Sequence, residues 1–165
     1  MEQKQIPGVS LAVMREGEIL KVEGYGLANV ELNVPVTPQS AFHTESLGKT
    51  FTAVGVMILV EEGKVELDDK VTKYFPGSPG WKDVTVRHLL THTSGIPDHV
   101  AEFGGAPFID FRQDYTEDEL IRLIAARPLD FEPGEKRIYC NSGYVILGAL
   151  IRRVTGKPWA AFLQE

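Results

Sequence analysis

The chain has 165 residues, of which 43% are hydrophobic and 24% are charged. This composition is that of an ordinary folded protein and excludes collagen-like, coiled-coil and disordered chains. The net charge of −6, from 17 basic and 23 acidic residues, argues against a general nucleic-acid binder. A single cysteine, Cys140, excludes an internal disulfide framework and any multi-cysteine metal site.

The N-terminal residues lack the apolar stretch of a signal peptide. The sequence therefore predicts no leader within this chain, and it leaves the cellular compartment open, a periplasmic or secreted parent included. The longest apolar run, residues 51–60, is interrupted by Thr52 and Gly55 and is too short to cross a bilayer. No membrane segment is expected.

The first part of the chain predicts a β-hairpin over residues 8–27. Two runs rich in strand-forming residues, 8–14 and 18–26, flank Arg15-Glu16-Gly17, where glycine permits a positive φ in the turn. Residues 33–38, with two prolines, are expected to be loop. A lone hairpin is only marginally stable in water, so another element must cover it.

The rest of the chain, residues 40–165, predicts a helical region. The expected helices are 46–62, 84–92, 116–127, 142–155 and one whose first turn begins at Pro158, with a long Gly- and Pro-rich loop at 94–114. Their ends rest on capping signals, which are Thr85, a capping box at Thr116–Glu119, Gly63 and Gly156. The expected fold class is α/β of the α+β kind, with residues 1–165 forming a single domain or the N-terminal portion of one.

Ser46 and Lys49 form the first candidate site. Residues i and i+3 of a helix share a face, so the Lys49 amine can reach the Ser46 hydroxyl. A lysine whose pKa is lowered by burial can take the proton of a serine and turn it into a nucleophile. At a helix start, Ser46 also lies near free backbone N–H groups, which suit a developing oxyanion. The alternative is a capped helix with a surface lysine, because six serines and nine lysines produce a Ser-x-x-Lys spacing readily by chance.

Tyr139 and Asn141 form the second candidate pair, directly before the helix expected at 142–155. A phenol can relay a proton when nearby cations lower its pKa, and an asparagine amide can hold a substrate amide or ester. The alternative is a buried tyrosine followed by an asparagine that caps the helix. Chance explains the two motifs together less readily than either one alone.

Around these motifs the sequence resembles the serine β-lactamase and penicillin-binding-protein superfamily, in particular its class C β-lactamase-like branch of esterases and DD-peptidases. The nucleophile helix is matched by Phe-His-Thr-Glu-Ser-Leu-Gly-Lys-Thr-Phe-Thr-Ala (42–53), and the second motif by Tyr-Cys-Asn-Ser-Gly-Tyr-Val-Ile-Leu-Gly (139–148). The further matching stretches, in the family's order, are 6–13, 62–69, 85–96 and 131–135. The resemblance implies a β-lactamase/transpeptidase-like fold, an antiparallel sheet with a helical subdomain, incomplete here at the C-terminus.

By this resemblance, Ser46 is the acylated nucleophile and Lys49 is the base or the group that holds its proton network. Tyr139 is the second proton-relay residue, and Asn141 positions the substrate carbonyl. The implied activity is acyl-enzyme formation on an ester, β-lactam or D-Ala peptide-type carbonyl, with no metal or cofactor. A tyrosine in the second motif, where other branches have serine, implies the class C-like branch, so no water activated by glutamate need be sought.

One departure from the family pattern concerns the C-terminal side. The family carries a third motif, Lys-Thr-Gly or His-x-Gly, on a later strand, and nothing after Asn141 matches it in context. We therefore expect the N-terminal portion of a longer enzyme, or one half of a split enzyme, that is poorly active alone. The expected protein partner is a complementing C-terminal segment or a second copy. The alternative function is a non-catalytic scaffold or binding protein of the same fold.

His88 and His92 have the i, i+4 spacing that can place two zinc ligands on one helix face. A zincin motif needs glutamate beside the first histidine, and Leu89 stands there instead, so no metal site is expected. Cys140 is expected to be a small buried hydrophobe rather than a nucleophile.

Overall fold

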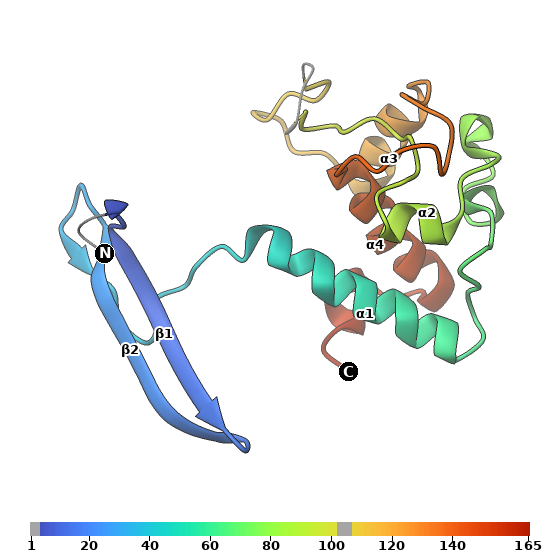
Figure 1. Cartoon of the computed structure of the whole chain (residues 1–165). Helices are drawn as coiled ribbons and strands as arrows, with labels where there is room; N and C mark the ends of the chain where they lie inside the picture. The colour runs from blue at the N-terminus through green and yellow to red at the C-terminus, as the bar shows by residue number, and fades with distance from the viewer. Residues whose placement is uncertain (1–3, 102–106) are drawn as a thin grey trace. The chain divides into compact units, whose positions relative to one another are not determined.

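The computed structural model describes residues 4–101 and 107–165, and the chain divides into two units, Met1–Glu45 and Ser46–Glu165 (Figure 1). The first unit contains a three-stranded antiparallel sheet, and the second contains the helices. The α+β class expected from the sequence is confirmed. Every helix within the described ranges is too short or too polar to cross a lipid bilayer.

The sheet consists of β1 (Gly8–Arg15), β2 (Glu18–Asn29) and β3 (Val34–Pro35), paired in that order. β1 and β2 form the expected hairpin. The turn residues Glu16 and Gly17 have φ values of 52° and 83°. Two positive φ angles in succession are what a two-residue type I′ turn requires, and the glycine adopts its angle without a steric penalty.

The short strand β3 corrects the expectation that residues 33–38 are loop. Val34 pairs with Asn29, and Pro35 pairs with Leu27, at the edge of the sheet. Proline has no N–H to donate, and it is tolerated here because an edge strand pairs on one side only. A strand of two residues has no periodicity by which a sequence could reveal it.

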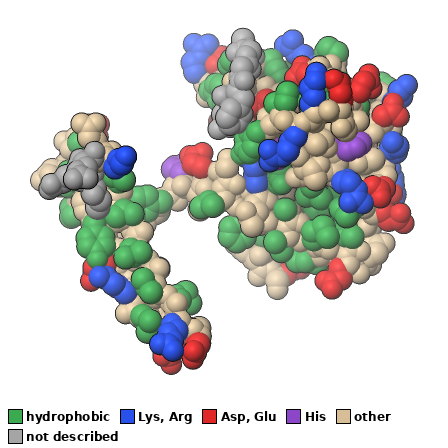
Figure 2. Space-filling view, in the orientation of Figure 1, with side chains coloured by type: hydrophobic (Ala, Val, Ile, Leu, Met, Phe, Trp, Pro, Cys, Tyr) green, Lys and Arg blue, Asp and Glu red, His purple; other side chains and the backbone are tan. Residues whose placement is uncertain are grey.

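The sheet leaves apolar side chains at the surface. Val36 is the only buried residue among the described residues of the first unit. Alternate residues of β1, Val9, Leu11 and Val13, remain 38–40% exposed, and Figure 2 shows apolar side chains along the hairpin. The first unit by itself therefore buries little apolar surface, as expected of a small sheet.

The central helix of the second unit is α4 (Asn141–Thr155). It packs against α1 (Gly48–Glu61), α2 (Val86–Leu90), α3 (Glu117–Ala125) and α5 (Trp159–Phe162). The fully buried residues of the shared core include Val56, Leu59, Trp81, Ile124, Ile146, Leu147, Leu150 and Ile151. Burial of each aliphatic side chain contributes about 1.5–3 kcal/mol. The core therefore holds α4 in place, and with it the residues at the N-terminal end of this helix.

The capping signals in the sequence lie at helix ends, as predicted. Thr85 accepts a hydrogen bond from the His88 N–H at the start of α2, and Thr116 accepts one from the Glu119 N–H at the start of α3. Gly156 ends α4 with a φ of 72°. These local interactions set the helix boundaries independently of tertiary packing.

Some helix boundaries differ from the expected ones. The helix expected from residue 46 begins as a 3₁₀ turn, Glu45–Leu47, which leads into α1. The helix expected at 84–92 is shorter, because α2 ends at Leu90. Pro158 lies at the N-cap of α5 rather than in its first turn. Such end effects of one or two residues depend on local packing that the sequence does not encode directly.

Gly95 and Gly63 offer a matched test of how tightly the loop after α2 is packed. Both have positive φ, 73° and 68°. A Cβ at Gly95 would lie 1.9 Å from the Phe131 carbonyl oxygen, whereas one at Gly63 would meet nothing within 4 Å. Gly63→Ala adds the left-handed backbone penalty of about 1–2 kcal/mol, while Gly95→Ala must also displace the backbone at Phe131.

We expect Gly95→Ala to lower the free energy of unfolding at least about twice as much as Gly63→Ala, since strain at a special φ and a backbone clash add. Urea denaturation followed by circular dichroism measures both variants. Equal losses would contradict the close contact at Gly95.

Candidate active site

Ser46 lies on the 3₁₀ turn Glu45–Leu47 that leads into α1, and it is exposed to solvent. Lys49, half-buried in the first turn of α1, donates from Nζ to Ser46 Oγ over 3.1 Å. The i, i+3 spacing therefore brings the amine onto the hydroxyl. Glu45, directly before the serine, has a φ of 47°, a left-handed conformation that residues with a Cβ rarely adopt. Backbone strain of this kind is found preferentially at functional sites.

Tyr139 reaches Ser46 from a segment far along the chain. Its Oη lies 2.5 Å from Ser46 Oγ, and either atom can be the donor. Lys49 Nζ lies 4.8 Å from the centre of the Tyr139 ring, within cation–π range. The Ser46 hydroxyl is thus in hydrogen-bonding contact with both an amine and a phenol.

Asn141 is the first residue of α4, the helix whose body lies in the core. Its Oδ1 accepts a hydrogen bond from Lys49 Nζ over 2.7 Å. A hydrogen bond to a charged group contributes about 1.5–3 kcal/mol, and this one joins α1 to α4. The structure therefore brings together all the side chains that the sequence singled out, Ser46, Lys49, Tyr139 and Asn141.

A carboxylate that sequence reasoning missed, Asp98, fixes the orientation of Asn141. Asp98 Oδ1 accepts the backbone N–H of Asn141 over 2.8 Å, and Oδ2 accepts from Nδ2 of the same residue over 3.2 Å. Because a carboxylate only accepts hydrogen bonds, the amide nitrogen must face it, and the amide oxygen then faces Lys49. The signal in the sequence was faint, an acidic residue just after the matched stretch 85–96.

His88 and His92 do not share a helix face. α2 ends at Leu90, so His92 lies beyond the helix, with a φ of 60°. His88 Nδ1 accepts from the Thr85 N–H over 3.3 Å, and His92 Nδ1 accepts from the Cys140 N–H over 3.2 Å. Within residues 4–101 and 107–165, no group of three or more His, Cys, Asp or Glu side chains could hold a metal ion.

Cys140 lies between Tyr139 and Asn141 but points away from solvent. It is buried, and its Sγ donates to the Ile96 carbonyl oxygen over 3.2 Å. Burial raises the pKa of the Cys140 thiol to about 11. The thiol is therefore protonated at neutral pH and is a poor nucleophile.

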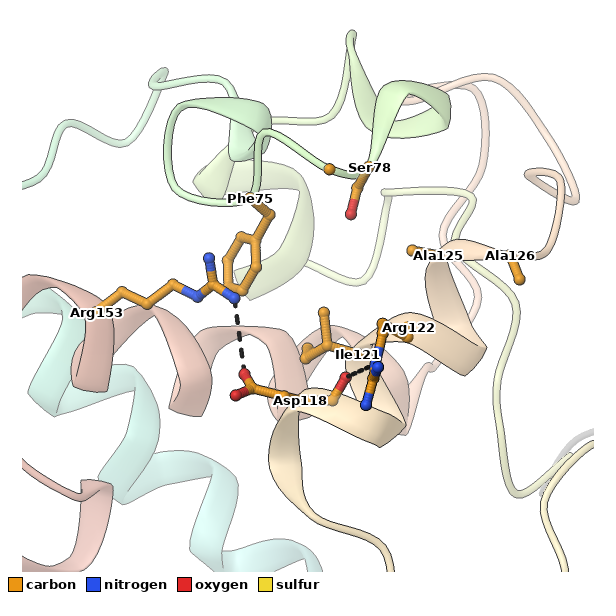
Figure 3. Close-up of a pocket in the computed structure, with 9 residues that line it drawn as sticks. Phe75, Ser78, Asp118, Ile121, Arg122, Ala125, Ala126 and Arg153 are labelled. Carbon is orange, nitrogen blue, oxygen red and sulfur yellow. Dashed lines mark hydrogen bonds and ion pairs between the residues drawn. The ribbon is translucent and has the colours of Figure 1, made fainter.

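A cavity of about 570 Å³ lies elsewhere in the helical unit (Figure 3). Its lining includes Phe75, Ser78, Asp118, Ile121, Arg122 and Arg153, and none of the clustered site residues. The Arg153 guanidinium lies 4.3 Å from the centre of the Phe75 ring, donates to the Tyr74 carbonyl oxygen over 2.8 Å and lies 3.7 Å from Asp118 Oδ1. The charge of Arg153 is therefore already paired within the fold. The residues that line this cavity do not include the serine, lysine and tyrosine of the candidate site.

The chain is similar to several known proteins over nearly its whole length. A protein-family model described as Beta-lactamase matches residues 1–165. The chain is 35% identical to penicillin-binding protein 4* of Bacillus subtilis (strain 168), over 99% of this chain and 36% of that protein. It is also 35% identical to esterase EstB of Burkholderia gladioli, over 98% of this chain and 44% of the esterase.

Among solved structures, the D-amino acid amidase of Ochrobactrum anthropi SV3, in complex with L-phenylalanine, is similar to the chain with a TM-score of 0.83. The identity is 33%, over 99% of this chain and 44% of the amidase. The chain spans less than half the length of each of these relatives.

Replacement of Asp98 by asparagine tests the role of the carboxylate in holding Asn141. The two N–H groups of Asn141 bind different oxygens of the carboxylate, and asparagine replaces one of these oxygens by an NH₂ group, which would face an N–H donor. We expect Asp98→Asn to lower the free energy of unfolding by about 1–3 kcal/mol. The exposed Asp114 provides a matched control, and Asp114→Asn should change the value by less than about 0.5 kcal/mol. Equal stability of the two variants in urea would count against the role of Asp98.

Proposed function

The chain belongs to the Beta-lactamase family, and we propose that Ser46 is the nucleophile of a serine hydrolase that works through an acyl-enzyme. The observation that carries the proposal is the position of Ser46 Oγ, 3.1 Å from Lys49 Nζ and 2.5 Å from Tyr139 Oη. A serine hydroxyl needs a base within hydrogen-bonding distance to attack a carbonyl carbon at a useful rate. This exposed hydroxyl has two such groups beside it.

In the proposed acylation step, Ser46 Oγ attacks the carbonyl carbon, and its proton passes to Lys49 or Tyr139, whichever enters the reaction deprotonated. The carbonyl π electrons move onto oxygen, and the backbone N–H of Ser46 stabilises the oxyanion. Collapse of this intermediate expels the amine or alcohol, which takes up the same proton. Water then attacks the acyl-enzyme, releases the acid and returns a proton to Ser46.

Asn141 is proposed to position the substrate carbonyl. Its Oδ1 is bound to Lys49 Nζ over 2.7 Å, and Asp98 keeps Nδ2 turned away from the lysine. Nδ2 is therefore the atom of this amide that can donate to a substrate oxygen. In this proposal, Asn141 binds Lys49 through Oδ1 and the substrate through Nδ2, and so fixes the position of the substrate carbonyl relative to the lysine amine.

The proposed substrate carries an ester, β-lactam or D-Ala peptide-type carbonyl. Support comes from the names of similar proteins, which include a penicillin-binding protein, an esterase and a D-amino acid amidase. Ester or peptide bonds are proposed ahead of β-lactams as the natural substrate, because the broad family acts mostly as esterases and peptidases. No metal or cofactor is part of the proposal.

The chain is proposed to act as the N-terminal portion of a longer enzyme, or together with a complementing C-terminal segment or a second copy. It spans 36% of one relative and 44% of another. The sequence carries no third active-site motif after Asn141, and the expected second half of the oxyanion hole belongs with that motif. The chain alone is therefore expected to react slowly.

Intact-mass spectrometry after incubation with a fluorophosphonate tests this proposal. We expect one adduct on the wild-type chain, none on Ser46→Ala and an undiminished adduct on Ser10→Ala, which changes an exposed serine of β1. Lys49→Met and Tyr139→Phe should slow the reaction by about 10²–10⁴-fold, the usual contribution of general acid–base catalysis. A penicillin in a parallel sample shows whether β-lactams also acylate Ser46.

An adduct that persists on Ser46→Ala would show that another residue is the nucleophile. No adduct from a folded wild-type sample would mean that Ser46 is not activated within these 165 residues, because the site is incomplete without the third motif or because the chain is a non-catalytic scaffold.

A further inference from the structure

His92 lies where the chain leaves α2, and it contacts each of the residues 138–140. Its carbonyl oxygen accepts the Ile138 N–H over 3.0 Å, and its Nδ1 accepts the Cys140 N–H over 3.2 Å. Between these two bonds, the imidazole stacks on the Tyr139 ring, with centroids 4.6 Å apart and planes inclined by 27°. His92 alone therefore binds the backbone on both sides of Tyr139 and packs against one face of the Tyr139 ring.

We propose that His92 is the positioning residue for Tyr139 and that it works as a neutral imidazole, holding the phenol against Ser46 Oγ. The inference rests on the proposed function, because it concerns the geometry of the same site. His92 does not itself touch Ser46 in any described contact. Its effect passes through the Tyr139 ring and the backbone on either side of it.

The neutral form follows from the hydrogen bond to Cys140. A nitrogen that accepts an N–H cannot carry a proton of its own, so the remaining proton of a neutral ring lies on Nε2. Protonation would place an N–H on both ring nitrogens, and the Nδ1–H would then face the Cys140 N–H. The acid form of His92 must therefore give up one of the contacts that hold the segment 138–140.

The surroundings of His92 also disfavour its charged form. His92 is 8% exposed. Among residues 4–101 and 107–165, the titratable or charged side chains around it come from several parts of the fold. Lys49 belongs to α1, and Asp98 to the loop after α2. Arg137, Tyr139 and Cys140 belong to the segment before α4, and Tyr144, whose ring is 5.1 Å away, belongs to α4. Burial lowers the pKa of His92 below its ordinary range, the positive charges of Arg137 and Lys49 lower it further, and Asp98 opposes them. The neutral form is therefore the one present at pH 7, and it is lost as the pH falls through this lowered pKa.

The backbone at His92 is strained in a way that supports a positioning role. Its φ of 60° lies in the left-handed region, which a residue with a Cβ rarely adopts outside functional or tightly constrained sites. Asparagine is the residue other than glycine that enters this region most readily. This tolerance makes His92→Asn a variant that can keep the backbone turn while removing the ring.

Two substitutions separate the contacts of His92. His92→Asn retains a polar acceptor near the position of Nδ1 and removes both the stacked ring and the titration. His92→Phe retains a stacked ring and removes the acceptor. His43→Asn, at an exposed position, is the matched control. The measured quantity is the rate at which a fluorophosphonate modifies Ser46, from about pH 8 down to about pH 5, the range in which a histidine titrates.

We expect both His92 variants to react about 10-fold to 100-fold more slowly than the wild type at pH 8, the penalty of a misplaced catalytic group. As the pH falls, the logarithm of the wild-type rate should decrease with a slope one unit steeper than that of His92→Asn. Only the wild type can lose the positioning of Tyr139 when the residue at position 92 takes up a proton. The His43→Asn profile should match that of the wild type. Parallel wild-type and His92→Asn profiles would show a structural role alone and would overturn the proposal.

A second measurement does not depend on catalysis. In the wild-type chain labelled with ¹⁵N-histidine and ¹³Cζ-tyrosine, we expect the His92 ring to carry its proton on Nε2 and the Tyr139 signal to shift as His92 titrates. A ring protonated on Nδ1, or a Tyr139 signal indifferent to the titration, would overturn the positioning role. If the coupled titration is seen but Ser46 does not react, the proposed function fails while the positioning role stands.

Discussion

The ammonium group of Lys49 is the point through which the parts of the site are joined. It donates to Ser46 Oγ on the 3₁₀ turn before α1 and to Asn141 Oδ1 at the start of α4, and it lies over the Tyr139 ring. Ser46 lies just before α1, whereas Tyr139 and Asn141 lie together at the start of α4. A small displacement of α1 against α4 would break at least one of the bonds, so the packing between these helices controls the geometry of the cluster.

The hydrophobic core supplies this packing. α4 is buried along most of its length and contacts every other α-helix of the unit, and α1 contributes Val56 and Leu59 to the same core. The loop after α2 then binds the N-terminal end of α4. In this loop, Asp98 accepts hydrogen bonds from the backbone and the side chain of Asn141. Apolar burial thus sets the position of the two helices, and a few directional hydrogen bonds set the orientation of the side chains at their ends.

Sequence reasoning was most successful where chemistry is local. The i, i+3 relation of Ser46 and Lys49, the capping box at Thr116 and the αL glycine at 156 depend on a few consecutive residues, and the structure places each of them as the local rules require. The resemblance to a known family added the link between Ser46 and Tyr139, which are 93 residues apart. No periodicity or spacing could have supplied that link.

Asp98 and His92 escaped sequence reasoning because their roles exist only in three dimensions. Asp98 is 43 residues from Asn141, and His92 is 48 residues from Cys140. Both lie in or beside a loop, where neither helix nor strand periodicity applies. The pair His88 and His92 even suggested a shared helix face, which the early end of α2 rules out. The two-residue strand β3 was missed for a similar reason, since its pairing depends on β2 rather than on its own composition.

The most direct test of this account is a double-mutant cycle between Lys49 and Asn141, measured as the free energy of unfolding in urea. Lys49→Met and Asn141→Leu each remove one partner of the bond between α1 and α4, and the double variant removes both. We expect a coupling free energy of about 1–3 kcal/mol, that of a hydrogen bond to a charged group. A coupling below about 0.3 kcal/mol, the level at which independent sites add, would contradict the claim that Lys49 joins the two helices.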